Sequence, residues 1–150
     1  KASIDYPTWE EQKLTVRAHI NDSFPKPMPV IDTQRIGQAR QLVKEVYIDE
    51  RIEQYIADIV FATRYPEQYK LQDMKDYISF GGSPRASINL ALASRACAFI
   101  KRRGYVIPED VREVAPDVLR HRIGLSYDAE AADIKADDIV RELLNRVEVP

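Results

Sequence analysis

The sequence predicts a mostly helical protein, and three observations support this fold class. Apolar residues recur at helical spacing in several separate segments, typical helix-start residues precede those segments, and one long stretch contains neither Gly nor Pro. The 150 residues are 45% hydrophobic and 31% charged, which is the composition of a globular domain. We expect an all-α helical bundle, with no internal repeat and no low-complexity tract.

The first residues differ from the rest because they read as a short strand. Lys1–Tyr6 could form one strand, which Pro7 ends. A single strand needs a partner, and the sequence offers none for it. We therefore expect that this chain is a piece cut from a longer protein. The first residue, Lys1, and the absence of a signal peptide fit that expectation.

A first helix is predicted directly after this strand. Thr8 and Glu11 form a capping box, in which each side chain accepts a backbone N–H of the other residue. The helix should reach about Ile20, with Leu14 and Ala18 facing inward.

Residues 21–30 contain three prolines, which exclude both a helix and a sheet ladder. This segment is predicted to be a stiff, extended connector and a boundary between two units, residues 1–31 and 32–150.

Two amphipathic helices should follow the connector. Asp32 or Thr33 caps the first, and Asp49 starts the second, which ends near Arg64. Residues 66–80 read as a polar loop. The apolar stripes contain Ile36, Ala39, Val43, Val46 and Tyr47 in the first helix, and Ile52, Tyr55, Ile56, Ile59, Val60 and Thr63 in the second.

The central helix is predicted to begin after two glycines. Ser83 is a favoured N-cap, and Pro84 occupies the first helical position, where proline is best tolerated. Residues 88–101 contain no Gly or Pro, so the helix should run for about five turns. Its residues are apolar on more than one face, which predicts a buried position. Lys101, Arg102 and Arg103 should neutralise its carbonyl end, and Gly104 should stop it.

Arg85 is the unusual residue of this helix. A cation in the first turn is disfavoured, because the free N–H groups already make that end positive. An anion between the guanidinium and those N–H groups would make the arrangement favourable, and phosphate is the usual occupant of such sites. The alternative is an ordinary solvated arginine, which costs only a few tenths of a kcal/mol.

Two further helical segments complete the predicted bundle. Pro108 opens the first, but Pro116 interrupts it, so we expect two short helices or a sharp kink. Residues 120–125 look irregular or briefly extended. The last amphipathic helix follows Asp137 and Asp138.

The composition argues against several functional classes. The net charge is −2, with both signs spread through the chain, so no basic field indicates nucleic acid. His19, His121 and Cys97 do not form a zinc-binding pattern, and no metal site is expected. No P-loop motif or Gly-x-Ser-x-Gly turn is present, so a self-contained enzyme is not expected. The single cysteine and the absence of a long apolar run predict a cytoplasmic protein without a membrane span.

The sequence resembles the C-terminal part of a MoxR-type AAA+ ATPase, along essentially its whole length. The most specific stretches are Gly81–Ala86 (GGSPRA) and Val114–Ile123 (VAPDVLRHRI). Gly104–Val111 (GYVIPEDV), Tyr47–Asp49 (YID) and Ala62–Arg64 (ATR) also fit the family.

The resemblance implies a role for each segment. Residues 1–31 would be the last strand and helix of the α/β ATPase core with the Pro-rich connector. Residues 32–47 would be a helix inserted before the lid, and the remainder would be the helical lid. Arg85 aligns with the sensor 2 arginine that contacts nucleotide phosphates, either of its own subunit or of a neighbouring one, and the nearby Ser83 and Ala86 belong to the same motif. Arg64 is a second candidate for the nucleotide pocket or a subunit contact.

The function implied by the resemblance is to couple ATP binding and hydrolysis to chaperone-like remodelling of partner proteins. The cofactor would be ATP, with Mg²⁺ held by a core domain whose Walker A and B segments lie outside these residues. The intact protein would form a ring, expected to be a hexamer, and its clients would include proteins with von Willebrand A domains. The alternative is a non-enzymatic helical module that binds protein, or nucleic acid through Lys101, Arg102, Arg103, Arg120 and Arg122.

Overall fold

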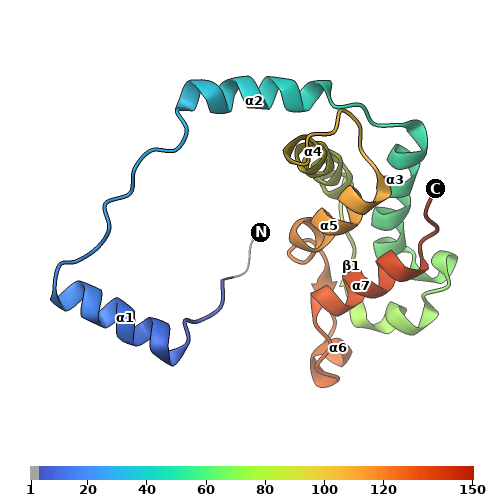
Figure 1. The fold of residues 1–150 in the computed structure, drawn as a ribbon. Coiled ribbons are helices and arrows are strands. Elements are labelled where there is room, and N and C mark those ends of the chain that lie inside the picture. Colours follow the sequence, from blue (N-terminus) through green and yellow to red (C-terminus); the bar gives the residue numbers. More distant parts are fainter. Residues whose placement is uncertain (1–3) are drawn as a thin grey trace. The chain divides into compact units, whose positions relative to one another are not determined.

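A computed structural model describes residues 4–150 of the chain (Figure 1). Contacts between residues divide the chain into two units, one ending at Gln38 and one formed by Ala39–Pro150. Helices dominate both units, as the sequence predicts.

The first unit contains α1 (Trp9–Ile20) and the start of α2 (Thr33–Glu45). The predicted capping box is present, because the Thr8 N–H donates to Glu11 Oε2 at 2.8 Å. The inward placement of Leu14 is wrong: its side chain is 61% exposed, and no described residue up to Gln38 is buried. Residues 1–3 of the expected strand lie outside the described residues, and residues 4–6 are not in a strand.

Helix α2 begins where the sequence predicts and ends earlier. Asp32 Oδ1 accepts the Arg35 N–H at 2.7 Å, which caps the first turn. The helix ends at Glu45, before the last two residues of the predicted stripe. Of these two, Val46 is buried and Tyr47 is exposed, because the chain from Val46 to Asp49 is no longer helical.

Helix α3 (Glu50–Arg64) supplies much of the core of the second unit. Asp49 caps it by accepting the Arg51 N–H at 3.0 Å. Its inward face matches the predicted stripe. The buried residues of this helix are Ile52, Tyr55, Ile56, Ile59, Val60, Ala62 and Thr63.

The segment predicted as a polar loop is more ordered than expected. It forms two 3₁₀ helices, η1 (Pro66–Tyr69) and η2 (Gln72–Tyr77), followed by strand β1 (Ile78–Phe80). Strand β1 pairs antiparallel with β2 (Gly124–Leu125), which lies in the stretch predicted to be irregular or briefly extended. These strands are too short to give an alternating pattern in the sequence.

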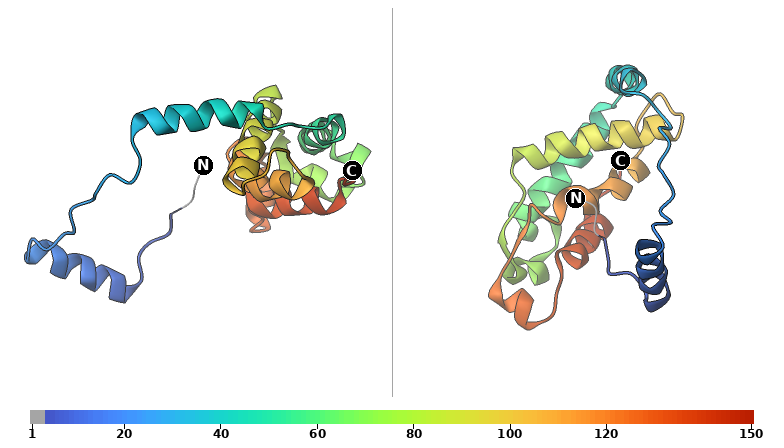
Figure 2. Two further views of the ribbon diagram at one scale, coloured as in Figure 1. Left: turned by 45° about the horizontal axis from the view of Figure 1, so that its top comes forward. Right: turned by 90° about the vertical axis from the view of Figure 1, so that its left-hand side faces the viewer.

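Helix α4 (Pro84–Ile100) packs against both α5 (Pro108–Leu119) and α3 (Figures 1 and 2). Its inner face is buried, but the prediction that the whole helix is buried is wrong. The exposed fractions of Ile88, Leu92 and Ile100 are 58%, 51% and 78%. These residues form one outward stripe, because they are spaced four and eight residues apart.

Helix α5 is continuous, which corrects the predicted break at Pro116. Pro116 lies in the last turn, where the missing N–H removes one helical hydrogen bond close to the helix end. The Arg120 N–H still donates to the Pro116 carbonyl at 3.0 Å. A short helix, α6 (Tyr127–Ala131), and the amphipathic α7 (Ala136–Arg146) follow, and α7 packs against α5 and α3.

A buried ion cluster fixes the corner between α4 and α5. Asp110 is completely buried, and its Oδ2 accepts hydrogen bonds from Arg103 Nη1 at 2.6 Å and from the Ile107 N–H at 3.1 Å. Lys101 Nζ lies 3.3 Å from Asp110 Oδ1. The chain turns through Arg102, whose φ is 59°, and not through Gly104 as predicted. The side chains of Lys101 and Arg103 therefore pair with Asp110, while their backbone N–H groups donate to the Cys97 and Ala98 carbonyls at the helix end.

These contacts set the protonation state of Asp110. Burial raises the pKa of its carboxyl, but the hydrogen bonds from Arg103, Ile107 and Lys101 outweigh burial and lower the pKa from 3.8 to about 2. The folded state therefore prefers the ionised carboxylate more strongly than the unfolded state does. The resulting stabilisation is present above the unfolded pKa and is lost as the pH falls from about 4 toward 2.

Strand β1 leads into a close contact with the end of α3. A Cβ atom placed on Gly81 would lie 2.4 Å from the Thr63 carbonyl oxygen and 2.6 Å from its carbon. These distances are far below van der Waals contact, and both atoms are backbone. Only glycine therefore lets the chain pass this close to α3 before it enters α4.

The Asp110 cluster gives a first prediction. Asp110→Asn should lower the free energy of unfolding by about 2 kcal/mol at pH 7, because the charge-assisted hydrogen bonds are lost. The difference from the parent chain should shrink as the pH falls toward 2. Urea unfolding at pH 7 and pH 3 measures both effects. Asp76→Asn, at an exposed carboxylate, is the control. Equal stability of Asp110→Asn and the parent chain at pH 7 would contradict the role of the cluster.

The Gly81 contact gives a second prediction. Gly81→Ala should destabilise the chain by about 1–3 kcal/mol, because the added methyl group overlaps backbone atoms of Thr63. Gly104→Ala is the matched control, since a Cβ there would meet nothing within 4 Å. Thermal unfolding of both variants is the measurement. If the two variants have the same melting temperature, the close contact at Gly81 is not formed in solution.

Candidate functional site

The site is built where the last turn of α3 meets the segment that opens α4. Thr63 is buried, and its hydroxyl accepts the Gly82 N–H at 2.7 Å. The same hydroxyl donates to the Val60 carbonyl at 2.6 Å. These two bonds tie the backbone before α4 to α3, across 19 positions of sequence. The structure thereby brings together two of the stretches singled out in the sequence, ATR and GGSPRA.

Ser83 is the N-cap residue of α4, as predicted, and has an extended backbone. Its side chain makes no capping hydrogen bond, so the hydroxyl is not used by the helix. The Ala86 N–H donates to the Ser83 carbonyl at 2.7 Å. Ala86 is completely buried, so its side chain belongs to the core and not to an open site.

Arg85 projects from the first turn of α4 and is exposed. Among residues 4–150 it forms no ion pair and no hydrogen bond. The first turn of α4 contains no acidic residue to compensate the positive helix end. The guanidinium is therefore available to bind an anion from outside this part of the chain.

Arg64 lies on the α3 side of the same turn. Its Cγ would be 2.7 Å from a Cβ placed on Gly81, and its guanidinium carbon lies 4.4 Å from the centre of the Phe61 ring. The Arg64 Nε is buried and has no hydrogen-bond partner among the described residues. Arg64 borders a cavity of about 200 Å³ that Glu67 and Lys75 also line.

The groups assembled here can bind an anion but are not arranged for proton transfer. They are guanidinium, hydroxyl and backbone N–H groups, which suit phosphate or carboxylate. In the described part of the chain, no cluster of His, Cys, Asp or Glu residues could hold a metal ion.

Cys97 is buried, and burial, followed by the charges of Glu113 and Asp110, raises the pKa of its thiol. A raised pKa makes this thiol a poor nucleophile.

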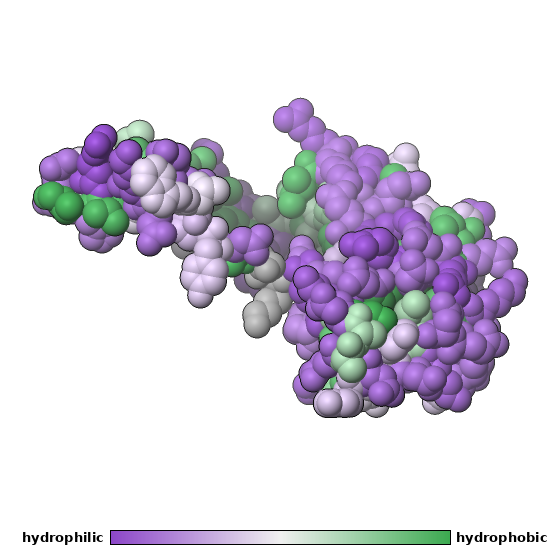
Figure 3. All heavy atoms as spheres, turned by 90° about the horizontal axis from the view of Figure 1, so that it is seen from below, coloured by the Kyte–Doolittle hydropathy of each residue, from purple (hydrophilic) through white to green (hydrophobic). Residues whose placement is uncertain are grey.

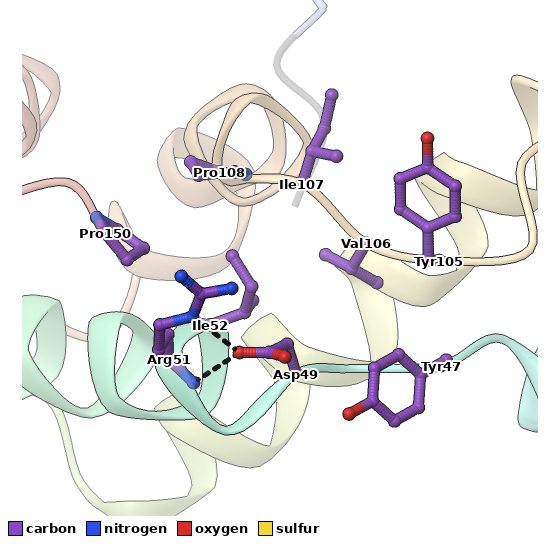
Figure 4. Close-up of a pocket in the computed structure, with 9 residues that line it drawn as sticks. All are labelled: Tyr47, Asp49, Arg51, Ile52, Tyr105, Val106, Ile107, Pro108 and Pro150. Carbon is purple, nitrogen blue, oxygen red and sulfur yellow. Dashed lines mark hydrogen bonds and ion pairs between the residues drawn. The ribbon is translucent and has the colours of Figure 1, made fainter.

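A separate pocket of about 330 Å³ lies where the chain enters α3 and α5 (Figure 4). Tyr47 and Tyr105 form an isolated parallel bridge at this junction, and both side chains are more than half exposed. Arg51 and Asp49, at the start of α3, line one side of the pocket as an ion pair, with the Arg51 Nε 3.0 Å from Asp49 Oδ1. None of the residues predicted for the phosphate site lines this pocket.

Two features of the site and its surroundings were not predicted from the sequence. Thr63 was placed on an apolar stripe, where a hydroxyl gives no sign of its partner 19 residues away. Lys75 lies in a segment read as a loop, and only the fold places it beside Arg64.

No helix among the described residues has the length and apolar character that crossing a bilayer requires.

Comparison with known proteins agrees with the fold. Residues 71–143 match the AAA lid domain family. The chain is 35% identical over its whole length to chaperone MoxR1 of Mycobacterium tuberculosis, and spans 40% of that protein. It is 29% identical over 81% of its length to protein MoxR of Methylorubrum extorquens, and spans 37% of that protein.

A solved structure shares the architecture. The crystal structure of a candidate ATPase from Cytophaga hutchinsonii superposes with a TM-score of 0.86 and 37% sequence identity. The superposition covers 98% of this chain and 45% of that protein, so the present chain spans less than half of each relative described here. The chain belongs to the MoxR family of AAA+ proteins and contains its AAA lid domain.

Proposed function

We propose that this chain is the nucleotide-sensing lid of a MoxR-type ATPase, and that Arg85 contacts the phosphates of ATP. The observation that supports this proposal is the exposed guanidinium of Arg85 at the positive end of α4, which has no ion-pair partner among residues 4–150. The turn that carries it is held by the buried Thr63–Gly82 hydrogen bond. A phosphate at this helix end would be attracted by the charge of Arg85 and by the helix dipole, and it would meet backbone N–H groups on a turn that is held in place.

The remaining groups for ATP hydrolysis belong to the part of the parent protein outside this chain. Phosphoryl transfer requires residues that hold Mg²⁺ and the triphosphate and that orient water. The sequence of this chain contains no P-loop for that purpose. When bound, Mg²⁺ would neutralise charge on the phosphates, and Arg85 would add a positive charge from the lid side. Arg64, on the other side of the Gly81–Gly82 turn, is a secondary candidate for the same pocket or for a subunit contact.

In the intact protein, the lid would couple nucleotide state to work on other proteins. We propose that the protein assembles into a ring, expected to be a hexamer, and remodels or assembles clients, including ones with von Willebrand A domains. The name of the mycobacterial relative, a chaperone, is in keeping with such a role.

Binding to nucleic acid through the cationic residues fits the contacts less well. Lys101 and Arg103 both pair with the buried Asp110. Arg120 pairs with Asp117 at 3.2 Å and with Asp137 at 3.0 Å. Duplex binding needs uncompensated cations gathered on one face, whereas three of the five cations considered for it are already paired with acidic residues of the unit.

The isolated 150-residue chain should not hydrolyse ATP, because it lacks the groups that bind Mg²⁺ and position water. Phosphate release from the purified chain with Mg²⁺ and ATP is the measurement, with the full-length parent protein as the positive control. A turnover that disappears when a residue of this chain is replaced would contradict the division of roles.

Arg85→Ala in the full-length parent should lower kcat for ATP hydrolysis by about 30- to 1000-fold, corresponding to about 2–4 kcal/mol of transition-state stabilisation. Its thermal stability should change little, because Arg85 has no partner among residues 4–150. Arg141→Ala, at another exposed arginine, is the control and should hydrolyse ATP at the parent rate. Unchanged turnover in Arg85→Ala would remove the basis for the proposed nucleotide contact.

A further inference from the structure

The hydroxyl of Thr63 occupies an unusual position between two backbone groups. It accepts the Gly82 N–H and donates to the Val60 carbonyl, so both hydrogen-bonding directions are used. Thr63 is 1% exposed, and the Gly82 N–H bond is buried with it. Water therefore does not compete for this bond, and a lost partner would leave the Gly82 N–H unsatisfied.

The backbone around Gly82 has little room to shift. A Cβ placed on Gly82 would lie 3.2 Å from the Ala86 Cβ, 3.4 Å from Val60 Cγ1 and 3.5 Å from Thr63 Oγ1. The preceding residue, Gly81, lies against the Thr63 carbonyl. The end of α3 thus contacts both glycines of this turn, Gly81 and Gly82. The first turn of α4 begins two residues later.

We propose that Thr63 is a positioning residue for the nucleotide contact, because its hydroxyl fixes the backbone from which Arg85 projects. The inference rests on the proposed function of Arg85 and adds a residue on a different helix to it. Arg85 is only three residues beyond Gly82, and among residues 4–150 its guanidinium has no ion-pair partner that would position it. Without the hydroxyl, the guanidinium would keep its charge, but the backbone before it would no longer be held against α3.

A purely structural role would have a different signature. Every buried hydrogen bond supports folding, so a loss of stability alone would not identify a positioning residue. If Thr63 positions Arg85, loss of the Thr63 hydroxyl should lower kcat by a larger factor than it changes KM for ATP. The same loss should have no effect on kcat when Arg85 is already absent. Geometry rather than affinity limits the reaction in that case.

The experiment uses the full-length parent protein and measures kcat and KM for ATP together with the melting temperature. Thr63→Val keeps the shape but removes both hydrogen bonds, and should lower kcat by about tenfold with KM changed less than about twofold. Thr63→Ser keeps the hydroxyl and should restore most of kcat. In an Arg85→Ala background, Thr63→Val should cause no further loss.

Two matched variants separate positioning from folding. Ser94→Ala removes another buried hydroxyl, which donates to the Leu90 carbonyl at 2.8 Å in the middle of α4. It should leave kcat unchanged even if the melting temperature falls. Gly82→Ala keeps Thr63 and places a methyl group 3.2 Å from the Ala86 Cβ, so the turn or Ala86 must shift slightly. We expect kcat to fall in the same direction, and this variant decides the question if Thr63→Val does not fold.

The possible outcomes distinguish this inference from the proposed function. If Arg85→Ala lowers kcat while Thr63→Val, or Gly82→Ala in its place, hydrolyses ATP at the parent rate, Thr63 is not a positioning residue and the Arg85 proposal survives. If Thr63→Val and Ser94→Ala lower kcat equally, the effect is structural and the inference is wrong. If Arg85→Ala has no effect, both proposals fail.

Discussion

The contact between the last turn of α3 and the Gly81–Gly82 turn is the constraint on which the site depends. It joins the helix that supplies much of the core to the helix that carries the exposed arginine. The contact requires a residue without a side chain at Gly81 and a buried hydroxyl at Thr63. The first requirement comes from backbone atoms of Thr63 and the second from the backbone N–H of Gly82, so repacking the neighbouring side chains would not remove either. The position of Arg85 is therefore a consequence of how two helices are joined.

The opposite end of α4 is fixed by different means. There the chain turns through Arg102. The buried carboxylate of Asp110 forms ion pairs with Lys101 and Arg103 and accepts a hydrogen bond from a backbone N–H. One end of α4 is held by a hydroxyl and the other by charge, while the outer stripe of the helix (Ile88, Leu92 and Ile100) is more than half exposed. By contrast, the face of the Ala39–Pro150 unit seen in Figure 3 is mostly hydrophilic, with hydrophobic residues in small groups.

The longer helices, several of their caps and the position of Arg85 could be predicted from the sequence, because they depend on residues within a few positions of one another, whereas the two 3₁₀ helices and α6 were not predicted. Thr8 with Glu11, Asp49 with α3, and Ser83 with Pro84 are examples. The pairing of β1 with β2 and the partner of Thr63 could not be predicted, since they join segments far apart in sequence. The continuous path of α5 through Pro116 and the exposure of Leu92 were misjudged because packing, not local preference, decides them.

The absence of any buried residue in the described part of the first unit affects how the chain would behave by itself. Helix α1 has only 12 residues, and a peptide helix of that length is marginal in water when nothing covers its apolar side chains. Backbone amides in such a helix exchange with solvent far faster than those beside Thr63. A protease would therefore cut first in this region, and trimming would leave the folded lid with its arginine still in place.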